Sequence, residues 1–195
     1  MNGTSWIHKR SVINIRYAQI RKMDVSNGEG IGVSLFVQGC HFHCKNCFNK
    51  DTWDFNGGKE WTEKIKKEFL TLINKPYITR VSILGGEPLA NENVNDVLLL
   101  IQEIKHQYPD KKIWLWSGCV FETIINPVIT DDLNPERDYI LNCRKEVLNY
   151  LDILVDGRFE EYKKDLTLKF RGSSNQRIID IKKSLEQNEV VLWCD

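Results

Sequence analysis

The chain has 195 residues, 42% of them hydrophobic, which is enough for one substantial core and too few for two full domains. Its 27 basic residues balance 27 acidic residues, so the overall charge gives no reason to expect nucleic acid or an anionic membrane as a partner. No apolar run has the length of a secretory signal or a membrane span, and we therefore expect a cytoplasmic protein without a membrane partner.

Short apolar runs and helical periodicity alternate along the chain, which predicts strands and amphipathic helices in turn. Thr62 is the expected N-cap of the first helix. The expected elements are a strand at 33–38, a helix at 61–73, a strand at 80–84, a helix at 93–107, a strand at 113–117, a helix at 137–151 and a strand at 153–156. The tail is less regular, with FRGSSNQRIIDI at 170–181 as a polar loop running into a strand, and VVLW at 190–193 as a last strand.

This order favours a mainly parallel sheet with crossover helices. A closed barrel of eight strand and helix units needs about 250 residues, so we expect this α/β chain to form an open, partial β/α barrel. It is expected to be one domain, with 1–30 as an N-terminal extension and first-strand region, 31–160 as the binding core, and 161–195 as a polar loop and closing segment.

Four loops directly follow the expected strands. Ligands of such folds bind at the carboxyl ends of the strands, so these loops are expected to meet on one rim. They are the cysteine loop after residue 38, GGEP at 85–88, Ser117 with Gly118, and Asp156 to Arg158.

The first of these loops, GCHFHCKNCFNKDTWDF, contains Cys40, Cys44 and Cys47. A reducing cytosol keeps thiols free, and clustered cysteines there more often bind metal than form disulfides. A structural zinc ion takes four ligands, and the fourth would be His41, His43 or the distant Cys143. An iron–sulfur cube is the other option, because three thiolates from one tight loop leave the fourth iron open for a substrate or cofactor.

Five motifs, in order along the chain, resemble one family. Cys40, Cys44 and Cys47, spaced as they are directly after a strand, are similar to the cluster motif of the radical S-adenosylmethionine (SAM) superfamily. More narrowly, SLFVQGC, CFNKDTWDF, LGGEPL, LVDGRFE and RGSSNQRII together resemble the activating proteins of anaerobic, class III ribonucleotide reductases. The resemblance extends from about residue 34 to residue 179. It implies a partial barrel of the radical SAM type.

The resemblance also implies ligands. The three cysteines would hold a [4Fe-4S] cluster whose open iron binds SAM. Gly85 and Gly86 would let the backbone approach the methionine part of SAM, and Glu87 would face its ammonium group. An ordinary strand-to-helix turn is the alternative interpretation of these residues.

Further roles follow from the same resemblance. Ser117 is a candidate contact for the ribose or carboxylate of SAM, Asp156 for its sugar or a monovalent cation, and Arg158 would act near the site of hydrogen transfer. A plain turn and a rim ion pair are the alternatives. Asn46 stands where the superfamily often has an aromatic residue on the adenine, and Phe48 or Trp53 would replace that contact.

Three other features have less definite interpretations. RGSSNQR at 171–177 is expected to serve SAM binding or partner docking. The rings of His41 and His43 are expected to shape the cysteine loop. The remaining cysteines have no matching spacing, and Cys143 is expected to pack within a helix. They are Cys119, Cys143 and Cys194.

The implied reaction is the activation of a reductase. An electron from the reduced cluster cleaves SAM, and the resulting 5′-deoxyadenosyl radical takes a hydrogen atom from a glycine of the reductase's large subunit. The implied partners are that large subunit and an electron donor such as flavodoxin or ferredoxin, and the family suggests a homodimer. The alternatives are an activase of another glycyl-radical enzyme, such as a formate-lyase type, a small radical SAM enzyme acting on a metabolite, and a non-catalytic zinc-binding adaptor. TWDF and RGSSNQR argue against the first two.

Overall fold

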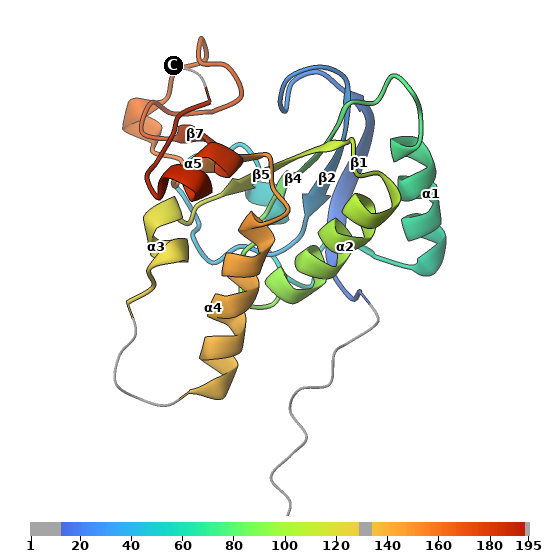
Figure 1. Cartoon of the computed structure of the whole chain (residues 1–195), viewed down its shortest axis with the longest axis horizontal. Coiled ribbons are helices and arrows are strands. Elements are labelled where there is room, and N and C mark those ends of the chain that lie inside the picture. The colour runs from blue at the N-terminus through green and yellow to red at the C-terminus, as the bar shows by residue number, and fades with distance from the viewer. Residues whose placement is uncertain (1–12, 129–133, 194–195) are drawn as a thin grey trace, which may run out of the picture.

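A single mixed sheet of seven strands forms the centre of the described part of the chain (Figure 1). The computed structural model describes residues 13–128 and 134–193. The strands lie in the order β3-β1-β2-β4-β5-β6-β7. Their bounds are β1 Arg16–Asp24, β2 Gly32–Val37, β3 Lys59–Glu60, β4 Arg80–Gly85, β5 Lys112–Ser117, β6 Ile153–Asp156 and β7 Arg177–Asp180.

The helices alternate with the central strands. They are α1 Glu63–Ile73, α2 Val94–Gln107, α3 Phe121–Ile125, α4 Pro135–Leu148 and α5 Ile181–Gln187, with short 3-10 helices at Lys50–Thr52 and Glu161–Lys163. Thr62 caps α1 as expected, because its side chain accepts a hydrogen bond from the Ile65 amide. In the described residues, none of these helices combines the length and the apolar character that crossing a membrane requires.

The centre of the sheet is parallel and its margins are antiparallel. β2, β4, β5 and β6 run in the same direction, whereas β1 and β3 on one side and β7 on the other are antiparallel to their neighbours. Val37 pairs with Gly85, and Ser117 pairs with Asp156, at the last residues of these strands. The carboxyl ends of the parallel strands therefore lie level with one another, as the alternation of elements predicted.

The helical face of the sheet holds the main core. Inward-pointing strand residues such as Leu35 and Ile83 pack with Phe69 of α1 and Ile101 of α2, and all four are fully buried. Figure 1 shows α1, α2 and α4 together on this face. Burying each such side chain contributes about 1.5–3 kcal/mol. This core therefore fixes the strand ends that carry the loops.

The opposite face is partly polar and is covered by the chain itself. Arg80 is fully buried there, and it donates to the carbonyl oxygens of Asp24 at 2.7 Å and Glu29 at 3.1 Å and to Ser82 Oγ at 2.8 Å. Burial lowers the pKa of the guanidinium. These bonds hold the connection between β1 and β2 against the sheet.

Two sequence expectations need correction. Residues 190–193 do not form a strand, because they meet β7 through a single bridge between Ile179 and Leu192, flanked by two backbone hydrogen bonds. The helix expected at 137–151 instead begins at Pro135, where Asn134 caps it by accepting a hydrogen bond from the Arg137 amide, and it ends at Leu148. Residues 1–12 of the expected N-terminal extension, and Cys194, lie outside the described residues.

Candidate functional site

The carboxyl ends of the parallel strands open onto one cleft of about 510 Å³, a volume typical of sites for small ligands. The cysteine loop, the glycine pair after β4, the turn after β5 and the loop after β6 all line it. The predicted site residues that line it are Cys40, Cys44, Cys47, Phe48, Trp53, Gly85, Gly86, Glu87, Ser117 and Arg158. The four loops singled out in the sequence therefore do meet at one place.

The cysteine loop is held in shape by its own aromatic residues. Gly39, with φ +98°, lies so close to the Phe55 ring that a side chain at this position would clash with it. The His41 ring packs on Phe55 with centroids 4.5 Å apart, and the His43 ring packs on Trp53 at 4.7 Å. Both imidazoles thus have the shaping role expected of them.

The thiols of the loop face the cleft and receive hydrogen bonds from backbone amides. The Asn49 amide donates to Cys47 Sγ at 3.4 Å. Burial raises the pKa of the Cys40 thiol, and amide hydrogen bonds within the loop oppose that effect. The pKa of Cys44 is raised by burial first and by the negative charge of Cys47 second. Three cysteine side chains thus line one wall, and backbone amides donate hydrogen bonds to their sulfur atoms. This arrangement suits the ligation of an iron–sulfur cluster.

A single metal ion is a poorer match to this arrangement. Among residues 13–128 and 134–193, no three His, Cys, Asp or Glu side chains converge closely enough to hold one ion. A tetrahedral zinc site needs its ligands about 2.0–2.3 Å from one point. The thiols instead line the wall of the cleft, and a cluster can be held at several separate corners.

Glu87 lies at the base of the cleft, where its carboxylate accepts three hydrogen bonds. Its Oε1 accepts from the Leu89 amide at 2.9 Å and from Ser117 Oγ at 2.7 Å, and its Oε2 accepts from the Gly118 amide at 2.7 Å. Only 4% of the residue is exposed. Burial raises the pKa of the carboxyl group, although the three donors oppose this effect. Glu87 therefore joins the loop after β4 to the turn after β5.

The glycine pair before Glu87 brings two strands into backbone contact. Gly85 has φ +111°, and a Cβ there would lie 2.8 Å from backbone atoms of Phe36 and Val37. A Cβ on Gly86 would lie 2.3 Å from the carbonyl oxygen of Gly39. No residue with a side chain fits either position, so the glycines are required by close packing against the cysteine loop.

Arg158 is placed against the same loop by an aromatic ring. Its guanidinium lies 4.2 Å from the centroid of the Phe42 ring, at a distance typical of a cation–π contact. The Phe42 ring in turn covers Gly118, where a Cβ would be 2.3 Å from the ring edge. Three of the loops thus interlock around Phe42.

Two predicted residues lie elsewhere. The Asn46 backbone is left-handed, with φ +55°, and its side chain bonds to Glu161 rather than lining the cleft. Asp156 is 1% exposed, and its carboxylate is bound by Arg177 and by the Phe121 amide, again away from the cleft lining. Their proposed contacts with SAM stay predictions. Phe48 does line the cleft, 57% exposed and packed on Phe159.

Most of the far wall of the cleft was not predicted from the sequence; its Arg171 belongs to the RGSSNQR motif, for which SAM binding was one of the expected roles. The wall includes residues of β1 and its following loop, of the face of the sheet opposite the helices, and of the segment before β7. The alternation in IWLWS at 113–117, which puts the tryptophans opposite Ile113 and Leu115, was the available signal for the sheet residues. The wall residues are Arg21, Ser26, Asn27, Phe36, Leu84, Trp116, Leu166, Leu168, Phe170 and Arg171.

The comparisons with known proteins define the class first. Residues 26–179 match the model of the 4Fe-4S single cluster domain family, and the matched segment contains the three clustered cysteines and all four strand-end loops. The chain therefore belongs to a class of iron–sulfur proteins.

Named relatives narrow this class. The chain is 37% identical over 164 residues to the anaerobic ribonucleoside-triphosphate reductase-activating protein of Salmonella typhi, covering 83% of this chain and 96% of that protein. The corresponding protein of Escherichia coli (strain K12) is 36% identical with the same coverage, and that of Enterobacteria phage T4 is 34% identical, with 84% of this chain and 93% of the phage protein covered. The chain belongs to the family of anaerobic ribonucleoside-triphosphate reductase-activating proteins.

Proposed function

We propose that this protein is the activating enzyme of an anaerobic ribonucleoside-triphosphate reductase. The observation that carries the proposal is the meeting of one three-cysteine loop with three other strand-end loops around a single cleft. Membership of the activating-protein family supports the same conclusion. When bound, a [4Fe-4S] cluster and SAM would supply a 5′-deoxyadenosyl radical that takes a hydrogen atom from a glycine of the reductase.

Cys40, Cys44 and Cys47 would hold the cluster at three corners. Their thiols share one wall of the cleft and are approached by backbone amides, which stabilise thiolate sulfur. The amino and carboxylate groups of SAM would bind at the remaining corner. Gly85 and Gly86 would give the methionine part access to backbone groups, as they already do for the cysteine loop.

Glu87 would provide the negative charge at the base of the site. Its three donors in the structure leave acceptor capacity on the carboxylate, which has about four lone-pair positions. An N–H of the SAM amino group would donate to the remaining position, in a hydrogen bond assisted by the charge of the carboxylate. Arg158, packed on Phe42, would lie beside the site of hydrogen transfer.

The open sheet would serve as a partial barrel of the radical SAM type within one domain. β3 and β7 are its edges in the described residues. A sheet that does not close would leave room at the cleft for a segment of another protein. The partner in this proposal is the large subunit of the reductase, with flavodoxin or ferredoxin as the electron donor and a homodimer as the assembly.

Anaerobic reconstitution tests the cofactor part of the proposal. The protein should take up about four irons, become brown, and cleave SAM when reduced by dithionite. Colourless protein that holds one tight zinc ion would instead support a zinc-binding adaptor and reject the enzyme.

A second experiment tests the partner. Reconstituted protein, SAM and dithionite are mixed with the large subunit of the reductase, and a glycyl doublet is sought by electron paramagnetic resonance. The same mixture with a formate-lyase type enzyme is the control. A doublet only with the formate-lyase type enzyme would assign the activase to the other partner.

A further inference from the structure

Residues 175–177 form the end of the RGSSNQR motif, and of these three only Gln176 lines the cleft. The side chains of all three form hydrogen bonds to residues 156–158, at the end of β6 and in the loop that follows it. We propose that Asn175, Gln176 and Arg177 form a clasp of positioning residues, anchored by Arg177, that sets Arg158 and the turn after β5 against the cysteine loop. This inference rests on the proposed function of the cleft.

In the clasp, the side chains of residues 175–177 donate hydrogen bonds to residues 158, 157 and 156 in turn. Asn175 Nδ2 donates to the Arg158 carbonyl at 2.8 Å, and Gln176 Nε2 donates to the Gly157 carbonyl at 3.0 Å. Arg177 Nε donates to Asp156 Oδ1 at 3.0 Å. The loop that carries Arg158 is thus bound at each residue by side chains from the chain segment that enters β7.

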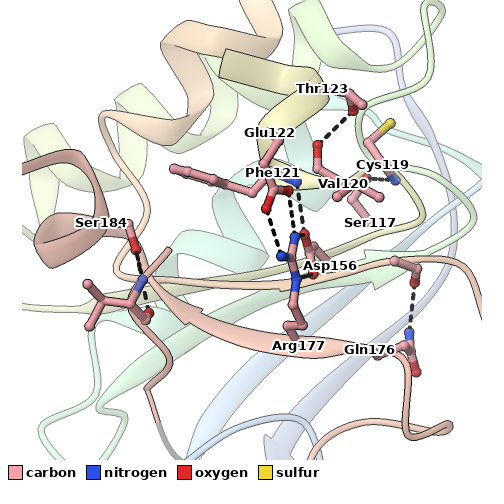
Figure 2. A network of polar contacts seen from close by, with 12 residues as sticks. Ser117, Cys119, Val120, Phe121, Glu122, Thr123, Asp156, Gln176, Arg177 and Ser184 are labelled. Carbon is pink, nitrogen blue, oxygen red and sulfur yellow. Dashed lines mark hydrogen bonds and ion pairs between the residues drawn. The ribbon is translucent and has the colours of Figure 1, made fainter. Parts of the chain in front are cut away.

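Arg177 is the anchor because it joins two elements at once. Besides Nε, its Nη2 donates to Asp156 Oδ2 at 2.5 Å, and Nη1 and Nη2 donate to the carboxylate of Glu122 at 2.8 and 2.7 Å (Figure 2). These bonds raise the pKa of Arg177, Glu122 first and Asp156 second. Asp156 is 1% exposed, whereas Glu122 is at the surface. One planar fork therefore fixes the end of β6 and the start of α3 together.

The connection continues from α3 to the cleft. Asp156 Oδ2 also accepts from the Phe121 amide at 2.8 Å, so the clasp holds the turn between β5 and α3, as Figure 2 shows. That turn carries Ser117 and Gly118, both bonded to Glu87. On the other branch, Arg158 lies over Phe42 of the cysteine loop. One branch from Arg177 therefore ends on groups proposed to meet SAM, and the other ends on Arg158, which is proposed to lie beside the site of hydrogen transfer.

This arrangement gives Asp156 a role different from a direct contact with SAM. Each of its carboxylate oxygens already has a donor from Arg177. Lysine cannot reproduce the fork, because its ammonium is a point charge without a planar set of donors. The clasp therefore depends on the shape of the arginine as well as on its charge.

The test compares Arg177→Lys, Asn175→Ala and a control, Lys182→Gln. Lys182 forms an ion pair of 2.7 Å with Asp152 at the start of β6, remote from the strand ends that form the cleft. For each reconstituted protein we would measure iron content, the denaturant midpoint, and kcat and KM for SAM cleavage under dithionite. Amide hydrogen exchange at Gly118 and Phe121 is measured on the cluster-free chain, relative to amides in β2 and β4.

We expect Arg177→Lys to keep its iron and to raise KM for SAM about tenfold, since small misplacements of binding groups have effects of this order or larger. Asn175→Ala should show a smaller rise, and Lys182→Gln none. Exchange at Gly118 and Phe121 should accelerate selectively in Arg177→Lys. A wild-type KM in Arg177→Lys would overturn the clasp. So would a loss of SAM cleavage in Arg177→Lys that is fully explained by its lower iron content or lower stability.

Two other outcomes are also decisive. If Arg177→Lys fails to fold or to hold iron, Arg177 is a residue of fold stability and the positioning role is rejected. If the wild-type protein holds its cluster but does not cleave SAM, the proposed function fails, and selective exchange in Arg177→Lys still decides whether the clasp exists.

Discussion

Replacing Glu87 by glutamine should stabilise the cluster-free protein at high pH. The change removes a charge from a site that is 4% exposed while keeping the size of the side chain. Burial raises the pKa of this carboxyl group, so the folded state holds its proton more tightly than the unfolded chain, whose Glu pKa is about 4.3. The wild type therefore loses stability as pH rises from that value through the raised pKa, and the variant does not.

The hydrogen bonds set the size of the effect. A protonated Glu87 and a glutamine are both uncharged, and each keeps one oxygen for the Leu89 amide and Ser117, so the two proteins should differ least at low pH. At pH 8 the variant should be more stable, by about 1.4 kcal/mol for each tenfold increase in proton affinity on folding. By contrast, Glu87→Ala leaves three buried donors without an acceptor, at a cost of about 1–3 kcal/mol each. This variant should be less stable than the wild type at every pH.

The assay is urea unfolding of the cluster-free chain at pH 5.5 and pH 8, under anaerobic reducing conditions. The quantity of interest is the difference between wild type and variant at the two pH values, because titration of all other groups cancels in it. A variant less stable than the wild type at pH 8, with the same pH dependence, would mean that the three donors outweigh burial. The same substitution should impair SAM cleavage, a gain in stability with a loss of function.

Three further changes give separate expectations. Cys44→Ala should abolish both the four-iron cluster and SAM cleavage, with Cys143→Ala in α4 as the matched control, and a variant of Cys44 that keeps its iron content would refute the ligand assignment. Gly118→Ala places a Cβ 2.3 Å from the Phe42 ring, so KM for SAM should rise while iron content stays near wild type, and an unchanged KM would contradict the interlock. Thr62→Ala removes the cap of α1 and should lower the free energy of unfolding by about 1 kcal/mol without changing SAM cleavage, as measured by denaturant titration.

The parts of the site that follow strands directly could be predicted from the sequence. Apolar runs such as 80–84 identify strands, and a parallel sheet places their carboxyl ends on one rim, so the loops with Glu87 and Ser117 were expected to meet. The glycine pair was identified for the same reason. The reason that both positions must be glycine is their contact with the backbone of β2 and of the cysteine loop. That contact depends on the register between β2 and β4, which no local sequence pattern specifies.

Tertiary partners far apart in the sequence could not be predicted. From the sequence, Asp156 was expected to be a carboxylate available at the rim of the sheet. In the structure it is bound by Arg177, which lies 21 residues later in the chain. Asn46 stands at the position where the superfamily often has an aromatic residue on the adenine. Its backbone is left-handed, however, and its side chain bonds to Glu161. The loop with Asn27 lines the cleft, and the buried side chains of Arg80 and Ser82 hold it across the sheet by donating to its carbonyl oxygens. These contacts arise from packing, which overrides local preference.

The walls of the cleft come from segments far apart in the sequence, on either side of the cysteine loop. Ser26 and Asn27 lie before the cysteine loop, and residues 166–172 lie more than a hundred positions after it. During synthesis the thiols therefore emerge long before their cavity can exist. A chain that stopped before residue 166 would carry every cysteine of the loop and yet lack the wall that residues 166–172 contribute to the cleft.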